Sequence, residues 1–122
     1  HTRAAELETV EMLESSGLHK DQIILHCFGG RKHIIKRAAA QGWNFSIPPV
    51  VKRLQHFETV IQEVPMPQLL TETDAPWLSP YSGQRNEPAF VFESINKIAA
   101  IKKITEADAM NIIYMNYQRV FE

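Results

Sequence analysis

The chain has 122 residues, which is enough for one hydrophobic core and fits a single domain over residues 1–122. Its 13 Lys and Arg nearly balance its 14 Asp and Glu, so composition gives no argument for nucleic acid or membrane binding, and no apolar run is long enough to span a bilayer. The single cysteine, Cys27, excludes an internal disulfide framework and, with no signal-peptide pattern, favours a cytoplasmic setting.

Helix-like and strand-like segments alternate along the first half. The pattern predicts a helix over 4–16, a strand over 21–27, a basic helix over 31–41 and a strand over 43–47. The strand over 21–27 contains the apolar run Ile23-Ile24-Leu25 and then the polar His26. The chain begins at His1, without Met and directly ahead of a helical pattern, which favours a piece of a longer protein.

The second half continues the same alternation. After a turn at Pro48-Pro49, apolar residues at helical spacing mark a helix face that comprises Val51, Leu54, Phe57, Ile61 and Val64. A third strand is predicted over 69–73, then a long loop over 74–87 and a helix over 88–101. A last helix opens at Thr105, with Asp108 in a variant of the capping box.

Three strands that are each followed by a helix predict an α/β fold with a parallel sheet. In such a sheet the carboxyl ends of the strands share one edge, so His26 and Asp74, together with His1, are expected there. Two imidazoles and a carboxylate suit a divalent metal, and the carboxylate can accept a proton from water. The alternatives are a hydrogen-bonded structural His26 and a turn-forming Asp74 ahead of Pro76.

Several motifs together resemble the TatD-type metal-dependent hydrolases. The segments that carry the resemblance are His1-Thr2-Arg3, His26-Cys27-Phe28-Gly29-Gly30, Leu70-Thr71-Glu72-Thr73-Asp74-Ala75-Pro76, Arg85-Asn86-Glu87-Pro88 and the closing Asn116-Tyr117-Gln118-Arg119-Val120-Phe121. They occur in the family's order and cover the whole chain. The resemblance implies the second, C-terminal half of a TIM-like (β/α)8 barrel of the amidohydrolase type, with parallel strands and outer helices, because a whole barrel needs about 250 residues.

The resemblance also implies roles for individual residues. His1 and His26 correspond to ligands of one divalent ion, and Asp74 to a ligand of the other and to the proton acceptor; the ions would be Mg, Mn or Zn. Glu72 would orient these ligands or the loop backbone, with pairing to Arg85 or to a loop amide as the alternative. Arg85 could hold a substrate phosphate, although Ser82 and Gln84 stand where family members often carry basic residues.

Three functions remain open at this point. The first is part of a metal-dependent deoxyribonuclease that cleaves phosphodiester bonds in DNA; the second is hydrolysis of another ester or amide. The third is a catalytically silent half-barrel that needs its N-terminal half or associates with itself through open sheet edges. The basic residues Arg31, Lys32, Lys36 and Arg37 are expected on a solvated helix face, and Cys27 is expected to be a packed apolar residue.

Overall fold

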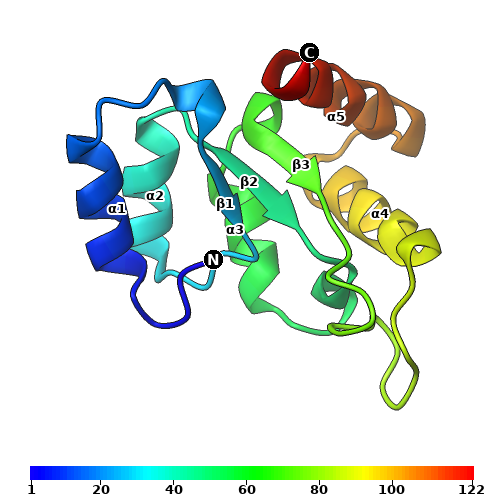
Figure 1. Ribbon diagram of the computed structural model, residues 1–122. Helices are drawn as coiled ribbons and strands as arrows, with labels where there is room; N and C mark the ends of the chain where they lie inside the picture. Colours follow the sequence, from blue (N-terminus) through cyan, green and yellow to red (C-terminus); the bar gives the residue numbers. More distant parts are fainter.

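A computed structural model describes all 122 residues and contains one parallel sheet of three strands (Figure 1). The strands are β1 (Ile24–His26), β2 (Asn44–Ile47) and β3 (Leu69–Thr71), and their spatial order is the order of the chain. Ile24 lies opposite Asn44, and Phe45 lies opposite Leu69. The predicted α/β fold with parallel strands is confirmed.

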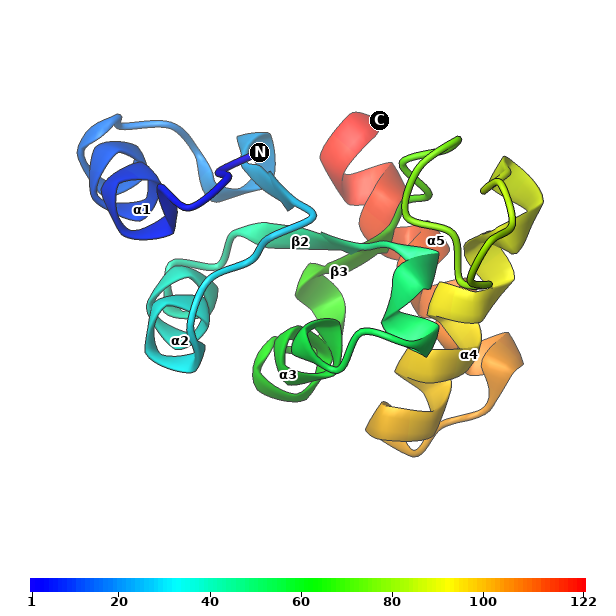
Figure 2. The same cartoon turned by 90° about the horizontal axis from the view of Figure 1, so that it is seen from below.

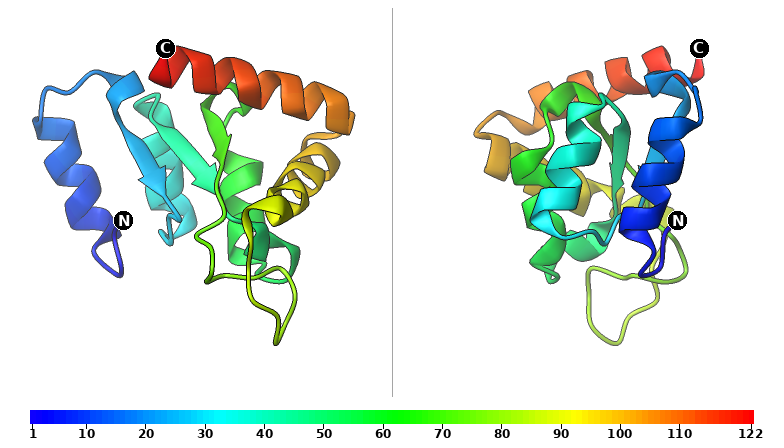
Figure 3. Two further views of the ribbon diagram at one scale, coloured as in Figure 1. Left: turned by 45° about the vertical axis from the view of Figure 1, so that its right-hand side comes forward. Right: turned by 90° about the vertical axis from the view of Figure 1, so that its left-hand side faces the viewer.

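Five α-helices surround this sheet. They are α1 (Glu6–Ser15), α2 (Lys32–Ala40), α3 (His56–Glu63), α4 (Val91–Lys102) and α5 (Glu106–Phe121). Figure 2 shows α2, α3 and α4 along one face of the sheet, whereas the C-terminal end of α5 lies toward the other face. Figure 3 shows α5 running across the end at which the strands begin. None of the helices is both long and apolar enough to cross a membrane.

The core lies between the sheet and the three helices on its covered face. Alternate strand residues point into it, because successive side chains of a strand face opposite ways. Leu25, Phe45, Ile47 and Leu69 are buried there against helix residues that include Ile35, Ile61 and Ile98. The open face is different. There Ile24, Ser46 and Leu70 meet Ile113, Tyr117 and Phe121 of α5 around a hollow of about 380 Å³.

Helix α5 is held to the strand starts by polar contacts. The Asn116 amide donates to the carbonyl oxygens of Met66 and Leu69 at 2.9 and 2.8 Å. Arg119 pairs with Asp21 and donates to the Asn44 side chain and to the Pro67 carbonyl. The closing motif of the chain therefore fixes the last helix to the beginning of the sheet.

The structure corrects several predicted boundaries. The helix face over Val51–Val64 is confirmed only in part. Phe57 and Ile61 are buried in α3, but Val51 lies in a 3₁₀ turn over Pro49–Lys52, Leu54 is exposed in the loop, and α3 begins only at His56. Proline at the start of the turn suits a short tight helix, which ends at Lys52, before Arg53 leaves helical geometry. Strand β1 is shorter than predicted because Lys20–Gln22 forms another 3₁₀ turn, capped by His19. The helix expected over 88–101 likewise opens with a 3₁₀ turn over Pro88–Phe90.

Candidate metal and catalytic site

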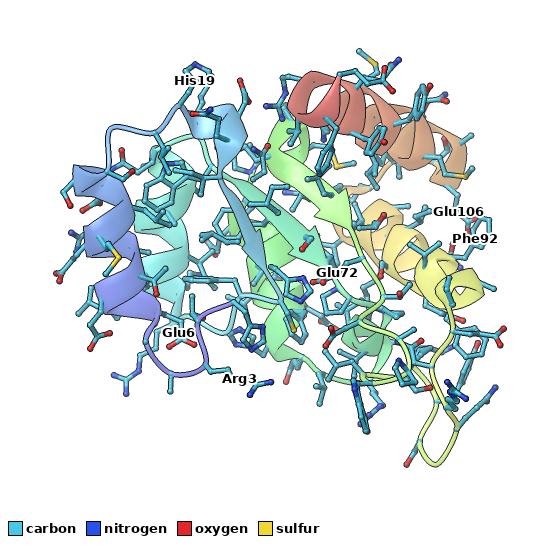
Figure 4. The ribbon with its side chains drawn as sticks, in the orientation of Figure 1. Arg3, Glu6, His19, Glu72, Phe92 and Glu106 are labelled. Carbon is cyan, nitrogen blue, oxygen red and sulfur yellow. The ribbon has the colours of Figure 1, made fainter.

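The carboxyl ends of β1 and β3 bring one imidazole and two carboxylates together. The Nδ1 atom of His26 faces Oε2 of Glu72, and its Nε2 atom lies 3.7 Å from Oδ1 of Asp74. Figure 4 shows Glu72 near the ends of the strands. Because Glu72 occupies one ring nitrogen, the other is turned toward Asp74. The structure thus brings together three of the residues that the sequence singled out.

Glu72 is fixed from two sides. Its Oε1 accepts the backbone N–H of Cys27 at 2.9 Å, and only a tenth of its side chain is exposed. Burial, with a further contribution from the charge of Asp74, raises the pKa of Glu72 to about 7. The predicted pairing with Arg85 does not occur, whereas a loop amide does bind this carboxylate. Glu72 therefore holds both the ring of His26 and the backbone that follows β1.

The backbone leaves each of these strands through a left-handed residue. Cys27 has φ of 49° and Asp74 has φ of 57°, a region that costs energy for residues with a Cβ and is often found at functional sites. The predicted strand over 69–73 ends early, at Thr71, so Asp74 lies in the following turn. Glu72 and Asp74 still reach the same imidazole, as expected from their spacing.

A buried amide holds the turn that carries Asp74. The side-chain amide of Asn86, only 2% exposed, donates to the carbonyl oxygens of Thr73 and Trp77, and its Oδ1 accepts the N–H of Glu87. The backbone N–H of Asn86 donates to the Pro76 carbonyl. Asn86 belongs to the motif Arg85-Asn86-Glu87-Pro88, but the sequence alone indicated no role for it. Only its place in that motif could have indicated a role, because its partners are backbone carbonyl oxygens, which every residue type has.

His1 lies beside this group without a direct bond to it. Its ring centroid is 5.6 Å from that of His26, and its Nε2 accepts the Nε–H of Arg3 at 3.0 Å. The side chain is exposed. His1 is therefore placed on the same edge as His26, as predicted from the sequence, with its second nitrogen engaged by Arg3.

The donor types present fit a divalent cation, since imidazole and carboxylate are ordinary ligands for zinc and manganese. The orientation of His26 by Glu72 is also the arrangement usual behind a metal-binding histidine. The number of possible metal ligands is small, however. No three or more His, Cys, Asp or Glu side chains of the chain are grouped closely enough to hold a metal ion.

The remaining candidates lie outside this group. Arg85 is exposed on the loop and forms no ion pair. Cys27 packs against the core, and burial, with the charges of Glu72 and Asp74, raises the pKa of its thiol to about 11. The predicted solvated face of α2 is confirmed: Lys32 and Lys36 pair with Glu63, and Arg37 pairs with Glu14.

Known proteins resemble the chain over its whole length. The chain is 31% identical over 121 residues to the deoxyribonuclease TATDN3 of Homo sapiens, covering 99% of this chain and 43% of that protein. It is also 31% identical to the metal-dependent hydrolase YabD of Bacillus subtilis, covering 99% and 49%. The chain thus spans less than half the length of these curated relatives.

Solved structures with low identity show the same fold. The TatD homologue YJJV of Escherichia coli superimposes with a TM-score of 0.85 at 20% identity, covering 97% of this chain and 47% of that one. An uncharacterized amidohydrolase of Saccharomyces cerevisiae gives 0.83 at 17% identity, covering 99% and 52%. The strands and helices therefore form about half of a TIM-barrel hydrolase fold. The family described as "TatD related DNase" matches residues 1–122, and the chain belongs to this family.

Proposed function

We propose that this chain is the C-terminal part of a divalent-metal-dependent phosphodiesterase that acts on DNA. The observation that carries the proposal is the orientation of His26, whose Nδ1 is held by Glu72 while its Nε2 faces Asp74. The names of the relatives, deoxyribonuclease and metal-dependent hydrolase, support the same chemistry. Hydrolysis of another ester or amide is the alternative within the enzyme class, because related barrels host many substrates.

Each residue of the site has a separate task in this proposal. His1 and His26 would hold one ion, and Asp74 would hold a second. Divalent cations bound there would lower the pKa of water and stabilise the negative charge that develops on a phosphoryl group. Asp74 accepts the proton that the attacking water loses, at Oδ1. Glu72 keeps the His26 ring in place, because its two oxygens are held by the imidazole and by the Cys27 amide. Arg85 binds a substrate phosphate from the loop.

The remaining ligands would come from outside these 122 residues. The open face of the sheet, with its apolar hollow beside α5, has the character of a surface that is covered in the active protein. The unpaired edges of β1 and β3 could each accept a further strand. We infer that an N-terminal half of the same barrel covers this face, and that a second copy of the chain covers it when that half is absent. On this inference the chain alone is catalytically silent.

Substituting Asp74 tests the proposed function in the intact polypeptide that contains this chain. Asp74→Asn keeps the shape of the side chain but removes its charge and its ability to take a proton. We expect release of nucleotides from an oligonucleotide, with Mg²⁺ or Mn²⁺ present, to fall by about a hundredfold or more. Glu106→Gln, an exposed carboxylate in the first turn of α5, is the control. Unchanged hydrolysis by the Asp74→Asn variant would remove the role given to Asp74.

A further inference from the structure

Ser46 lies at the carboxyl end of the central strand, between the two strands that carry the candidate ligands. Its register partners are His26 on β1 and Leu70 on β3, so the side chains of these three residues lie on the same, open face of the sheet. Glu72 follows Leu70 by two residues, and its backbone N–H donates to the Ile47 carbonyl at 3.2 Å, which continues the pairing past the end of β3. The Ser46 side chain is therefore placed beside both His26 and Glu72.

The Ser46 hydroxyl is buried without a well-placed partner. The residue is only 7% exposed, and its Oγ atom is enclosed without a hydrogen bond of regular geometry. Oε2 of Glu72 is likewise enclosed and accepts no hydrogen bond of regular geometry, although it faces Nδ1 of His26. Buried polar atoms are almost always hydrogen-bonded, because an unpaired one loses its hydration without replacement. A donor and an acceptor that both need a partner thus lie at neighbouring strand ends.

The electrostatics of Glu72 indicate the same neighbour. Burial raises the pKa of this carboxyl, and the Ser46 hydroxyl is the strongest influence that lowers it, ahead of the Cys27 backbone N–H. A hydroxyl has this effect as a donor within hydrogen-bonding reach of the carboxylate. Ser46 and Glu72 are therefore close enough to interact directly.

A carboxylate that orients a histidine needs its own plane fixed. The torsion that turns a Glu carboxylate is soft, so one donor alone does not determine where the second oxygen points. The Cys27 N–H binds Oε1 of Glu72 at 2.9 Å. A donor to Oε2 from another strand fixes the remaining rotation, and Ser46 is the residue on β2 that is placed to supply it.

We propose that Ser46 is a positioning residue of the candidate metal site, whose hydroxyl donates to Oε2 of Glu72 and thereby fixes the ring of His26. The contacts then run across all three strands, from Ser46 on β2 through Glu72 after β3 to His26 on β1. Nε2 of His26 stays directed toward Asp74. This inference rests on the proposed metal-dependent function and adds to it a residue that acts on the site through Glu72.

Binding of Mn²⁺ by the intact polypeptide, measured by titration calorimetry without substrate, tests the inference. We expect Ser46→Ala to weaken binding about tenfold, the lower end of what loss of a contact behind a metal ligand costs. Ser94→Ala is the matched control. Ser94 is also buried with an unpartnered Oγ, but it lies on α4, which covers the other face of the sheet. Its substitution should leave the Mn²⁺ affinity within about twofold of the wild-type value.

Two further variants separate the hydroxyl of Ser46 from its shape. Thr and Val have nearly the same shape and both suit a strand, but only Thr keeps a hydroxyl. Crowding by the larger side chain is therefore common to both variants. We expect Ser46→Thr to bind Mn²⁺ within about twofold of the wild type, and Ser46→Val to bind it about tenfold more weakly than Ser46→Thr.

A double-mutant cycle with Glu72→Gln tests whether Ser46 acts through Glu72. When the Gln oxygen accepts the Cys27 N–H, its amide nitrogen stands where Oε2 was and offers the Ser46 hydroxyl no acceptor. In that background Ser46→Ala should weaken Mn²⁺ binding by less than about twofold, against about tenfold in the wild type, because residues that share one network have non-additive effects.

Three results would overturn the inference: wild-type affinity in Ser46→Ala, equal affinities of Ser46→Thr and Ser46→Val, or the same loss with and without Glu72→Gln. These outcomes do not depend on hydrolysis. If Ser46→Ala binds Mn²⁺ normally while Asp74→Asn loses hydrolysis, the positioning role is wrong and the phosphodiesterase function stands. If Ser46→Ala binds weakly while Asp74→Asn hydrolyses normally, the function proposed for Asp74 is wrong and the positioning role stands.

Discussion

Glu72 connects the two strand ends that carry the candidate ligands. It spans from β3 to the residues after β1, where it binds both His26 and the Cys27 amide. Glu72→Gln keeps an oxygen for the amide but replaces the carboxylate that faces Nδ1. Loss of such a partner typically weakens metal binding by about tenfold to a hundredfold. We expect a decrease of that size in the affinity of the intact polypeptide for Mn²⁺ or Zn²⁺, measured by titration calorimetry.

Glu87→Gln is the control for this substitution. Glu87 lies on the same loop and is exposed, and its side chain forms no ion pair. The two variants therefore differ in contact with His26 rather than in net charge. Equal metal affinity in both would mean that Glu72 serves only the Cys27 backbone, and the orienting role would be abandoned.

At the scale of an element, Asn116 shows how the last helix is secured. The residue is only 4% exposed, and its amide donates to the carbonyl oxygens of Met66, in the turn before β3, and of Leu69, at the start of β3. Asn116→Ala leaves both carbonyls without that donor, so the free energy of unfolding should fall by about 2 kcal/mol. Asn111→Ala removes an exposed amide from the same helix and should change it by less than about 0.5 kcal/mol. Urea denaturation measures both. A loss no larger than that of the control would show that the Asn116 amide does not stabilise the position of α5.

The elements also show what the sequence could and could not predict. Apolar runs such as Ile23-Ile24-Leu25 predicted the strands, and Thr105 correctly marked a helix start, since its hydroxyl accepts the Asp108 N–H. The predicted helix face over Val51–Val64 was wrong before His56, because helical spacing of apolar residues persists through a 3₁₀ turn and a loop. The bond from Cys27 to Glu72 joins residues 45 apart, and no local pattern signals such a contact. No local pattern signals the ion pair between Arg119 and Asp21 either.

At the scale of the whole molecule, the sheet and the candidate metal site both leave groups without partners. The covered face of the sheet is packed like a complete domain, whereas the open face ends in an apolar hollow. The candidate metal site likewise has few ligands, since no three His, Cys, Asp or Glu side chains are grouped closely enough to hold a metal ion. Both features fit the N-terminal half proposed above, because in a closed barrel the same strands fill the interior and supply the site.

This division predicts how the 122-residue chain behaves alone. Apolar residues of the hollow, including Tyr117 and Phe121, are 45% and 58% exposed, so a second copy of the chain should cover them. We expect sedimentation velocity to show association that increases with protein concentration. Phe121→Ser should weaken it, because truncation of a large apolar side chain that is well packed at the centre of an interface costs more than about 1 kcal/mol.

Met115→Ser is the matched control for this change. Met115 lies on the same helix and is 65% exposed, yet it does not line the hollow. If the association arises from the hollow, it weakens in Phe121→Ser and persists in Met115→Ser. Equal effects of the two substitutions would point instead to unspecific apolar contact along α5. A chain that stays monomeric at every concentration would show that the open face needs no cover, and the inferred association would then be wrong.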